Sequence, residues 1–292
     1  MATKHQTISK LAAETTAALA ADPNQYMAFL ETAGHNFKYS FLDQVLIHAQ
    51  KPEATACAEI EAWNKLGRWV NRGTKGIALL SDAPGQNRIR YVFDVSDTNS
   101  RLPQTIMPWT LEAKHEEAVR EALSNSFGKV DETISFGGFL TEIAANAAED
   151  NLSDYLFDLM QVKEGSLLEE LDELNTEVWL KTTLQNSVAY MTLIRCGRDP
   201  GAYFSPEDFS RVIDFNTPET FAILGTAASD IAEMILREVA VTVRSQNRAE
   251  KESLRTFAKT AETAYDEGEK QTDERSADHG TDLHHAGVLS DS

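Results

Sequence analysis

Aromatic and basic residues are interleaved between residues 37 and 98, a combination of side chains that can bind a single nucleic-acid strand. Aromatic rings provide faces on which bases stack, and Lys and Arg neutralise phosphates, so such sites tolerate many base sequences. We expect three residues to stack on bases, namely Tyr39, Trp69 and Tyr91. We expect phosphate contacts from Lys65, Arg68, Arg72, Lys75 and Arg90, and the full candidate set adds Trp63 and Arg88.

A small hydrophobic core is the alternative interpretation of these residues. Trp63 and Trp69 would then be buried, and the charged residues would form a solvated rim. At least one of the two tryptophans is expected to be buried on either interpretation.

The glycines of this stretch do not form a phosphate-binding loop. Five residues separate Gly67 from Gly73, and Thr74 precedes Lys75, whereas the P-loop needs four residues and a Lys directly after its second glycine. We therefore expect the glycines to mark a turn into a strand, where a positive φ angle is needed.

The remaining reactive residues do not indicate an enzyme. His115 and Glu116 begin a zinc-protease pattern, but Val119 stands where the second His is required. Cys57 and Cys196 lie among apolar residues, which is typical of buried cysteines rather than nucleophiles. We expect no catalytic residue, no metal ion and no cofactor, although a hydrolase built from a buried cluster of carboxylates or histidines would leave no such pattern.

Charge is distributed unevenly along the 292 residues, whose net charge is −19. Residues 1–110 hold 11 basic and 10 acidic residues, and the remaining residues hold 16 basic and 36 acidic ones. An acidic surface repels phosphates, so nucleic acid is expected to bind only to a local patch in the first part. The two cysteines and the absence of a long apolar run favour a reducing, cytoplasmic location without membrane contact.

Hydrophobic periodicity predicts an α+β fold with a small N-terminal domain at 1–108, an all-helical domain at 109–252 and a disordered tail at 253–292. Strands are expected at 55–58, 77–80 and 88–93. Ser40-x-x-Asp43 is the pattern of a capping box and predicts the start of a helix. The expected helices are 7–21, 25–34, 40–51, 111–127, 139–151, 154–162, 167–196, a helix from 205, and 229–248.

The segments Trp63-(x3)-Gly67-(x2)-Val70-(x2)-Gly73-x-Lys75-Gly76 and Val92-Phe93-Asp94-Val95 resemble the N-terminal single-stranded-DNA-binding domain of ArdC-type antirestriction proteins. More broadly, the chain is similar to the N-terminal part of large proteins of integrative conjugative elements. Those proteins continue into DNA-methyltransferase-like and helicase regions. Asp43 replaces the Asn that ArdC-type helices often carry, which favours a capping role there.

The resemblance implies a non-enzymatic single-stranded-DNA-binding module of a mobile element, related to DNA transfer or antirestriction. Conjugation or helicase proteins are expected to contact the acidic helical domain. The alternative is an acidic helical module that binds a basic protein partner or mimics DNA, because Glu164 to Glu177 form a strongly acidic stretch. A solvated helix face would have the same composition.

Overall fold

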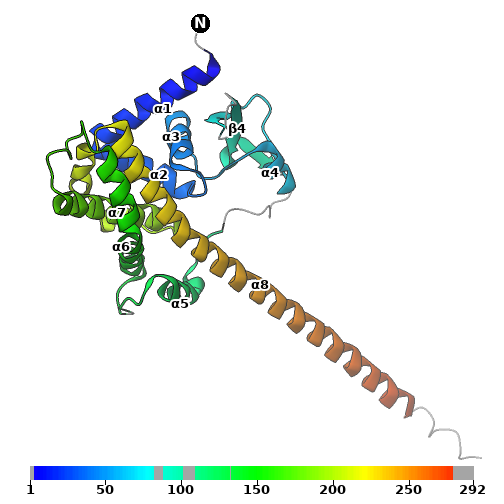
Figure 1. Ribbon diagram of the computed structural model, residues 1–292. Helices are drawn as coiled ribbons and strands as arrows, with labels where there is room; N and C mark the ends of the chain where they lie inside the picture. Colours follow the sequence, from blue (N-terminus) through cyan, green and yellow to red (C-terminus); the bar gives the residue numbers. More distant parts are fainter. Residues whose placement is uncertain (1–2, 82–87, 101–108, 132, 279–292) are drawn as a thin grey trace, which may run out of the picture. The chain divides into compact units, whose positions relative to one another are not determined.

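The computed structural model describes residues 3–81, 88–100, 109–131 and 133–278, with side chains as far as residue 256. Helices dominate this part of the chain, and short antiparallel strands lie between residues 57 and 100, so the expected α+β class is confirmed (Figure 1). The chain forms two compact units, residues 1–243 and 244–292.

Three helices begin the chain, and their bounds agree with the sequence pattern. They are α1 at Lys4–Ala21, α2 at Pro23–His35 and α3 at Phe41–Gln50. Asp22 caps α2 by accepting a hydrogen bond from the backbone N–H of Asn24. Ser40 caps α3 by accepting the backbone N–H of Asp43, as the sequence predicts, but the Asp43 carboxylate has a different partner, described below.

The strands form two separate antiparallel sheets. The first has the order β1-β4-β3, from Cys57–Ala58, Ile89–Asp94 and Ile77–Leu80, and it contains the strands expected from the sequence. The second pairs β2 at Arg68–Val70 with β5 at Thr98–Ser100. Neither strand of this second sheet was expected, because three residues are too few to show an alternating pattern.

The edge of the first sheet is capped by a side chain. Ala78 on edge strand β3 donates its backbone N–H to Oε1 of Gln50 and accepts from Nε2 of the same amide, with both bonds 2.9 Å long. The Gln50 amide thus takes the place of a neighbouring strand and fixes α3 against the sheet.

The later helices differ in several places from the expected ones; α8, for example, begins at Pro218 rather than at residue 229 and continues to Asp278. Residues 139–151 and 154–162 belong to one continuous helix, α6, because no Gly or Pro interrupts the chain between them. The helix that begins after Ser205 is a 3₁₀ helix, η4. The helices after β1 are α4 at Ile60–Lys65, α5 at Glu116–Phe127, α6 at Phe136–Val162, α7 at Glu173–Arg195, η4 at Pro206–Asp214 and α8 at Pro218–Asp278.

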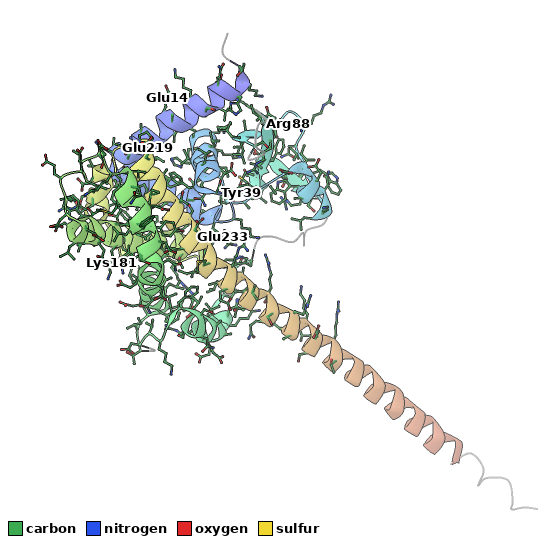
Figure 2. All side chains as sticks on the ribbon, viewed as in Figure 1. Glu14, Tyr39, Arg88, Lys181, Glu219 and Glu233 are labelled. Carbon is green, nitrogen blue, oxygen red and sulfur yellow. The ribbon has the colours of Figure 1, made fainter. Side chains whose placement is uncertain are left out.

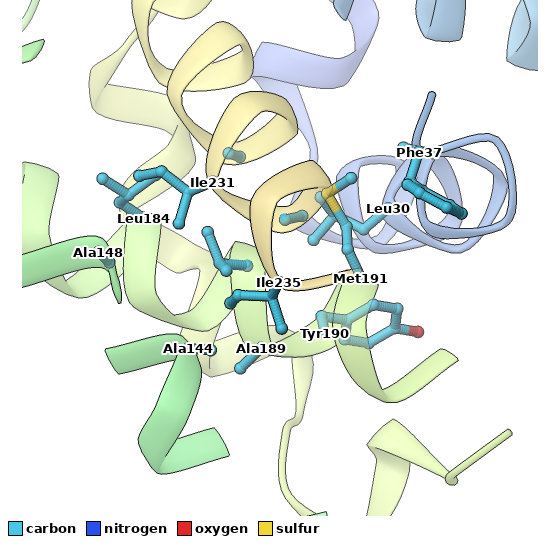
Figure 3. Packing of buried hydrophobic residues seen from close by; sticks show 14 of the residues in the cluster. Leu30, Phe37, Ala144, Ala148, Leu184, Ala189, Tyr190, Met191, Ile231 and Ile235 are labelled. Atoms are coloured by element: carbon cyan, nitrogen blue, oxygen red, sulfur yellow. The ribbon is translucent and has the colours of Figure 1, made fainter. Parts of the chain in front are cut away.

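Two hydrophobic cores hold residues 1–243 together. The smaller core joins α1 and α3 to strands β3 and β4 through residues such as Ile8, Leu46 and Val92. The larger core joins α2, α6, α7 and α8. Figure 3 shows part of the larger core, with side chains that include Leu30, Phe37, Leu184, Met191, Ile231 and Ile235.

Helix α2 therefore shares one core with the helices that follow residue 109. The domain boundary expected at 108 lies in residues 101–108, outside the described residues, and stays a prediction. Helix α8 continues to Asp278, so residues 253–278 of the expected tail have helical backbone, while 279–292 lie outside the described residues.

Candidate nucleic-acid interface

A tight turn connects β2 to β3, and three of the candidate residues lie on it or next to it, namely Trp69, Arg72 and Lys75. The backbone N–H of Thr74 donates to the carbonyl of Asn71 at 3.2 Å, which closes the turn, and Gly73 has a φ of +88°. Gly67, at the start of β2, has a φ of +69°. The expected role of these glycines in a turn is confirmed, because residues with side chains rarely adopt such angles.

Trp69 lies on β2 opposite Asn99 of β5, and its side chain is 49% exposed. Arg72 and Lys75 follow within six residues of chain and are both exposed. No ion pair to Arg72 or Lys75 is found among the residues whose side chains are described. An exposed indole and two cations therefore belong to one short, glycine-bounded segment.

Trp63 on α4 has a structural role. Its side chain is 3% exposed, and its indole N–H donates to the carbonyl of Phe93 at 2.8 Å. The expectation that at least one of the two tryptophans is buried is confirmed. Trp63 therefore presents no exposed face on which a base could stack.

Arg68 also contacts the protein rather than solvent alone. Its guanidinium lies 6.0 Å from the centre of the Trp63 ring. It donates to Oγ1 and the backbone carbonyl of Thr98 at 2.7 and 3.2 Å. These bonds join β2 to the start of β5 and engage Nε and Nη2 of the guanidinium that the sequence assigns to phosphates.

Arg90 and Tyr39 connect α3 to the first sheet. The Arg90 guanidinium pairs with the buried carboxylate of Asp43 and lies 5.9 Å from the centre of the Tyr39 ring. The Tyr39 hydroxyl donates to the carbonyl of Cys57 at 2.9 Å. Burial raises the pKa of Tyr39 far above its ordinary value, so the hydroxyl stays protonated as a donor. Figure 2 labels Tyr39 at this junction.

Tyr91 is the second exposed aromatic side chain of the candidate set. It lies on β4 opposite Ala78 and is 38% exposed. Lys4 of α1 lies 4.8 Å above its ring, a cation–π contact. A Cβ on Gly76 would lie 3.2 Å from the Tyr91 Cβ, so the residue after Lys75 packs directly against Tyr91.

We call Lys4, Trp69, Arg72, Lys75 and Tyr91 the candidate patch. Lys4 was not expected in this site, because it lies at the start of α1 and no local pattern connects it to Tyr91, 87 residues later. Lys65 and Arg88 are also exposed without an ion pair among the described side chains, but no described contact joins them to the patch. Figure 2 shows Arg88 extending outward from the sheet.

A cavity of about 620 Å³ borders the patch at Thr74, Lys75 and Gly76. Gln50 and Lys51 at the end of α3 line its other side. Lys51 pairs with Asp97 at 2.8 Å and donates to the Ser96 hydroxyl at 2.9 Å, so its charge is largely compensated. Lys75 is therefore the lining cation without such a partner among the described side chains.

Asp94 fixes the backbone beside this cavity. One carboxylate oxygen accepts the backbone N–H groups of Thr55 and Ala56, both at 2.8 Å, and the other accepts the N–H and hydroxyl of Ser96. Burial alone would raise the pKa of Asp94. The hydrogen bonds outweigh burial and hold the pKa below its ordinary value, so Asp94 stays ionised.

The described residues contain no cluster of three or more His, Cys, Asp or Glu arranged to hold a metal ion. His115 is buried, and its Nδ1 accepts the backbone N–H of Glu112 at 3.0 Å, which gives it a helix-capping role. Within the same described part of the chain, every helix is too short or too polar to cross a membrane.

Comparison with known proteins leaves the resemblance to ArdC-type proteins as a prediction. No protein-family model matches this chain, and no similar curated protein or solved structure was found.

Proposed function

We propose that the protein binds single-stranded DNA through the candidate patch. The observation that carries this proposal is the exposure of Trp69, Arg72 and Lys75 on one short segment, with the exposed Tyr91 in contact with Lys4. Exposed aromatic rings beside uncompensated cations suit stacked bases and their phosphates, whatever the base sequence. Each base stacked on Trp69 or Tyr91 contributes about 1–3 kcal/mol to binding.

The surrounding contacts make the patch rigid before DNA arrives. Trp63, Arg68, Tyr39 and Arg90 are held by hydrogen bonds or ion pairs inside the protein. A rigid site loses less conformational entropy when it binds a flexible strand. These four residues therefore support the interface indirectly, and the direct contacts come from the patch.

The likeness to ArdC-type and conjugative-element proteins supports a role in DNA transfer or antirestriction. In such a role the patch holds a strand during its passage between cells or shields it from nucleases. The net charge of −19 disfavours binding by the acidic helices, because their carboxylates repel phosphates. Weak, salt-sensitive binding by a small number of contacts is the expected behaviour.

Fluorescence anisotropy tests this proposal. A labelled oligothymidine of about 20 nucleotides is titrated with the full chain at several salt concentrations, since α2 shares its core with later helices. The proposal requires binding whose log affinity falls linearly with log salt and which weakens about 5- to 150-fold in Trp69→Ala. Absence of salt-dependent binding at low ionic strength would overturn it.

A second candidate function is docking of a basic protein partner on α6 and α7. Residues 149–177 contain 10 acidic residues and one basic residue, Lys163. Phe157 and Leu174 are among the exposed large apolar side chains of this stretch, and the exposed Val178 directly follows it. A basic amphipathic peptide should then bind with a heat that calorimetry can measure. Leu174→Asp and Val178→Asp should abolish this heat of binding, and a wild-type protein that gives none would exclude this function.

A further inference from the structure

The first turns of the second compact unit carry a stripe of basic residues. Arg244, Arg248, Lys251 and Arg255 are spaced by four, three and four residues along α8. These spacings place all four on one helix face, because an α-helix has 3.6 residues per turn. We call these four residues the basic stripe. It is about 16 Å long, from a rise of 1.5 Å per residue.

All four residues of the basic stripe are exposed. No ion pair to any of them is found among residues 3–81, 88–100, 109–131 and 133–256, whose side chains are described. Arg237, seven residues before Arg244, differs in this respect, because it pairs with Glu233 at 2.8 Å. The four residues of the basic stripe thus form no ion pair among the described side chains, although Glu252 lies four residues after Arg248 and three before Arg255.

The composition of this face selects one kind of partner. A helix that docks in a protein groove needs apolar anchors at spacings of three, four and seven residues, and a helix that lies on a membrane needs a broad apolar face. Between Arg244 and Thr256 the sequence offers one large apolar residue, Leu254. The basic stripe therefore provides charge without an apolar face, which suits the phosphates of a nucleic-acid backbone.

We infer that the basic stripe of α8 is a second nucleic-acid contact, which binds the phosphate backbone without reading bases. This inference rests on the proposed function in assuming the same class of ligand, but it does not require the candidate patch. We expect binding by the basic stripe to be mainly electrostatic, because residues 244–256 include no aromatic residue. Every phosphate that the stripe contacts adds about 0.7 to the slope of log affinity against log salt for a single strand.

The test compares full-length variants by anisotropy with labelled oligothymidine of about 20 nucleotides between 50 and 200 mM salt. The stripe variant is Arg248→Gln with Arg255→Gln, and the patch variant is Arg72→Gln with Lys75→Gln. Lys129→Gln with Lys181→Gln is the matched control, which removes the same net charge from α5–α7. Gln is a good helix former, so the stripe variant keeps its helix, which circular dichroism verifies.

The inference predicts a slope about 1.4 lower in the stripe variant than in the control. The wild-type affinity ratio between the two salt concentrations should exceed that of the variant about sevenfold. If the stripe variant matches the control while the patch variant loses slope, the stripe inference is wrong and the proposed function stands. If the stripe variant loses slope and the patch variant does not, the stripe binds and the patch assignment fails. A wild type that shows no salt-dependent binding contradicts both.

Discussion

Arg90 of β4 forms an ion pair with Asp43 of α3, although 47 residues separate them in sequence. The Asp43 side chain is 5% exposed, and the ion pair with Arg90 helps to compensate its buried charge. The pair fixes the start of α3 against the sheet and removes Arg90 from the cations accessible to a ligand. A residue that sequence alone assigns to phosphate binding thus stabilises the fold.

Replacing Arg90 should affect stability more than DNA binding. Arg90→Gln removes the ion pair between Arg90 and the buried Asp43 carboxylate, and we expect a loss of about 2–4 kcal/mol in the free energy of unfolding. Urea denaturation measures this loss. Lys75→Gln is the control on the same part of the chain, and its unfolding midpoint should match the wild type because Lys75 is exposed. Equal stability of the two variants would show that the ion pair contributes little.

The two tryptophans of this region should respond in opposite ways. Trp63→Ala removes a buried indole and its hydrogen bond to Phe93, so we expect a stability loss of about 3–5 kcal/mol. Trp69→Ala removes a half-exposed ring and should cost less stability than Trp63→Ala while weakening DNA binding. Thermal unfolding and anisotropy together separate the two effects. A destabilised Trp69→Ala protein with wild-type affinity would speak against a stacking role.

Gly34 of α2 is required for close packing against α7. A Cβ at this position would lie 2.7 Å from the backbone carbonyl oxygen of Met191, which cannot move without shifting its helix. We expect Gly34→Ala to lower stability by about 1–3 kcal/mol, even though alanine is the better helix former. Glu31→Ala, an exposed position in the same helix, is the control for melting temperature. An unchanged melting temperature in Gly34→Ala would mean that the two helices can separate at little cost.

Stability should decrease below about pH 6.5 partly because of His48. Burial lowers the pKa of His48 below its ordinary value of 6.5, and its Nδ1 lies 2.8 Å from the Thr32 hydroxyl. The unfolded chain then binds a proton more readily than the folded one. The stability contributed by neutral His48 is complete above the pKa of His48 in the unfolded chain. It is lost as the pH falls through the lowered pKa of His48 in the folded chain.

Urea unfolding at about pH 7.5 and 5.5 checks this dependence. His48→Gln should lose less stability between the two pH values than the wild type does. His35, whose pKa is also lowered by burial and by Arg195, accounts for part of the remaining decrease. An identical decrease in His48→Gln and wild type would assign the effect to other groups.

Much of the fold follows from local sequence patterns. The apolar spacing of α3 is reproduced in the structure, since Phe41 and Val45 join the larger core and Leu46 and Ile47 the smaller one, and β4 forms where a strand was expected. Strands β2 and β5 could not be predicted, because their pairing depends on contacts between residues about 30 positions apart. The same long-range pairing exposes Trp69 while Trp63 is buried, although both have basic neighbours.

The candidate site was predictable in composition but not in geometry. Residue types identified Trp69, Tyr91, Arg72 and Lys75, whereas the partners of Arg68, Arg90 and Tyr39 became known only from the folded chain. Lys4 contacts Tyr91 because α1 packs on the sheet, which no local pattern indicates. Tertiary contacts therefore decide which cations remain accessible.

The salt dependence of single-strand binding in matched double variants tests the central claim most directly. Arg72→Gln with Lys75→Gln should lower the slope of log affinity against log salt by about 1.4, because two phosphate contacts disappear. Arg68→Gln with Arg90→Gln removes the same net charge from side chains bonded within the protein. At a temperature where it stays folded, this variant should retain the wild-type slope. Equal slopes for both variants and the wild type would contradict DNA binding by the candidate patch.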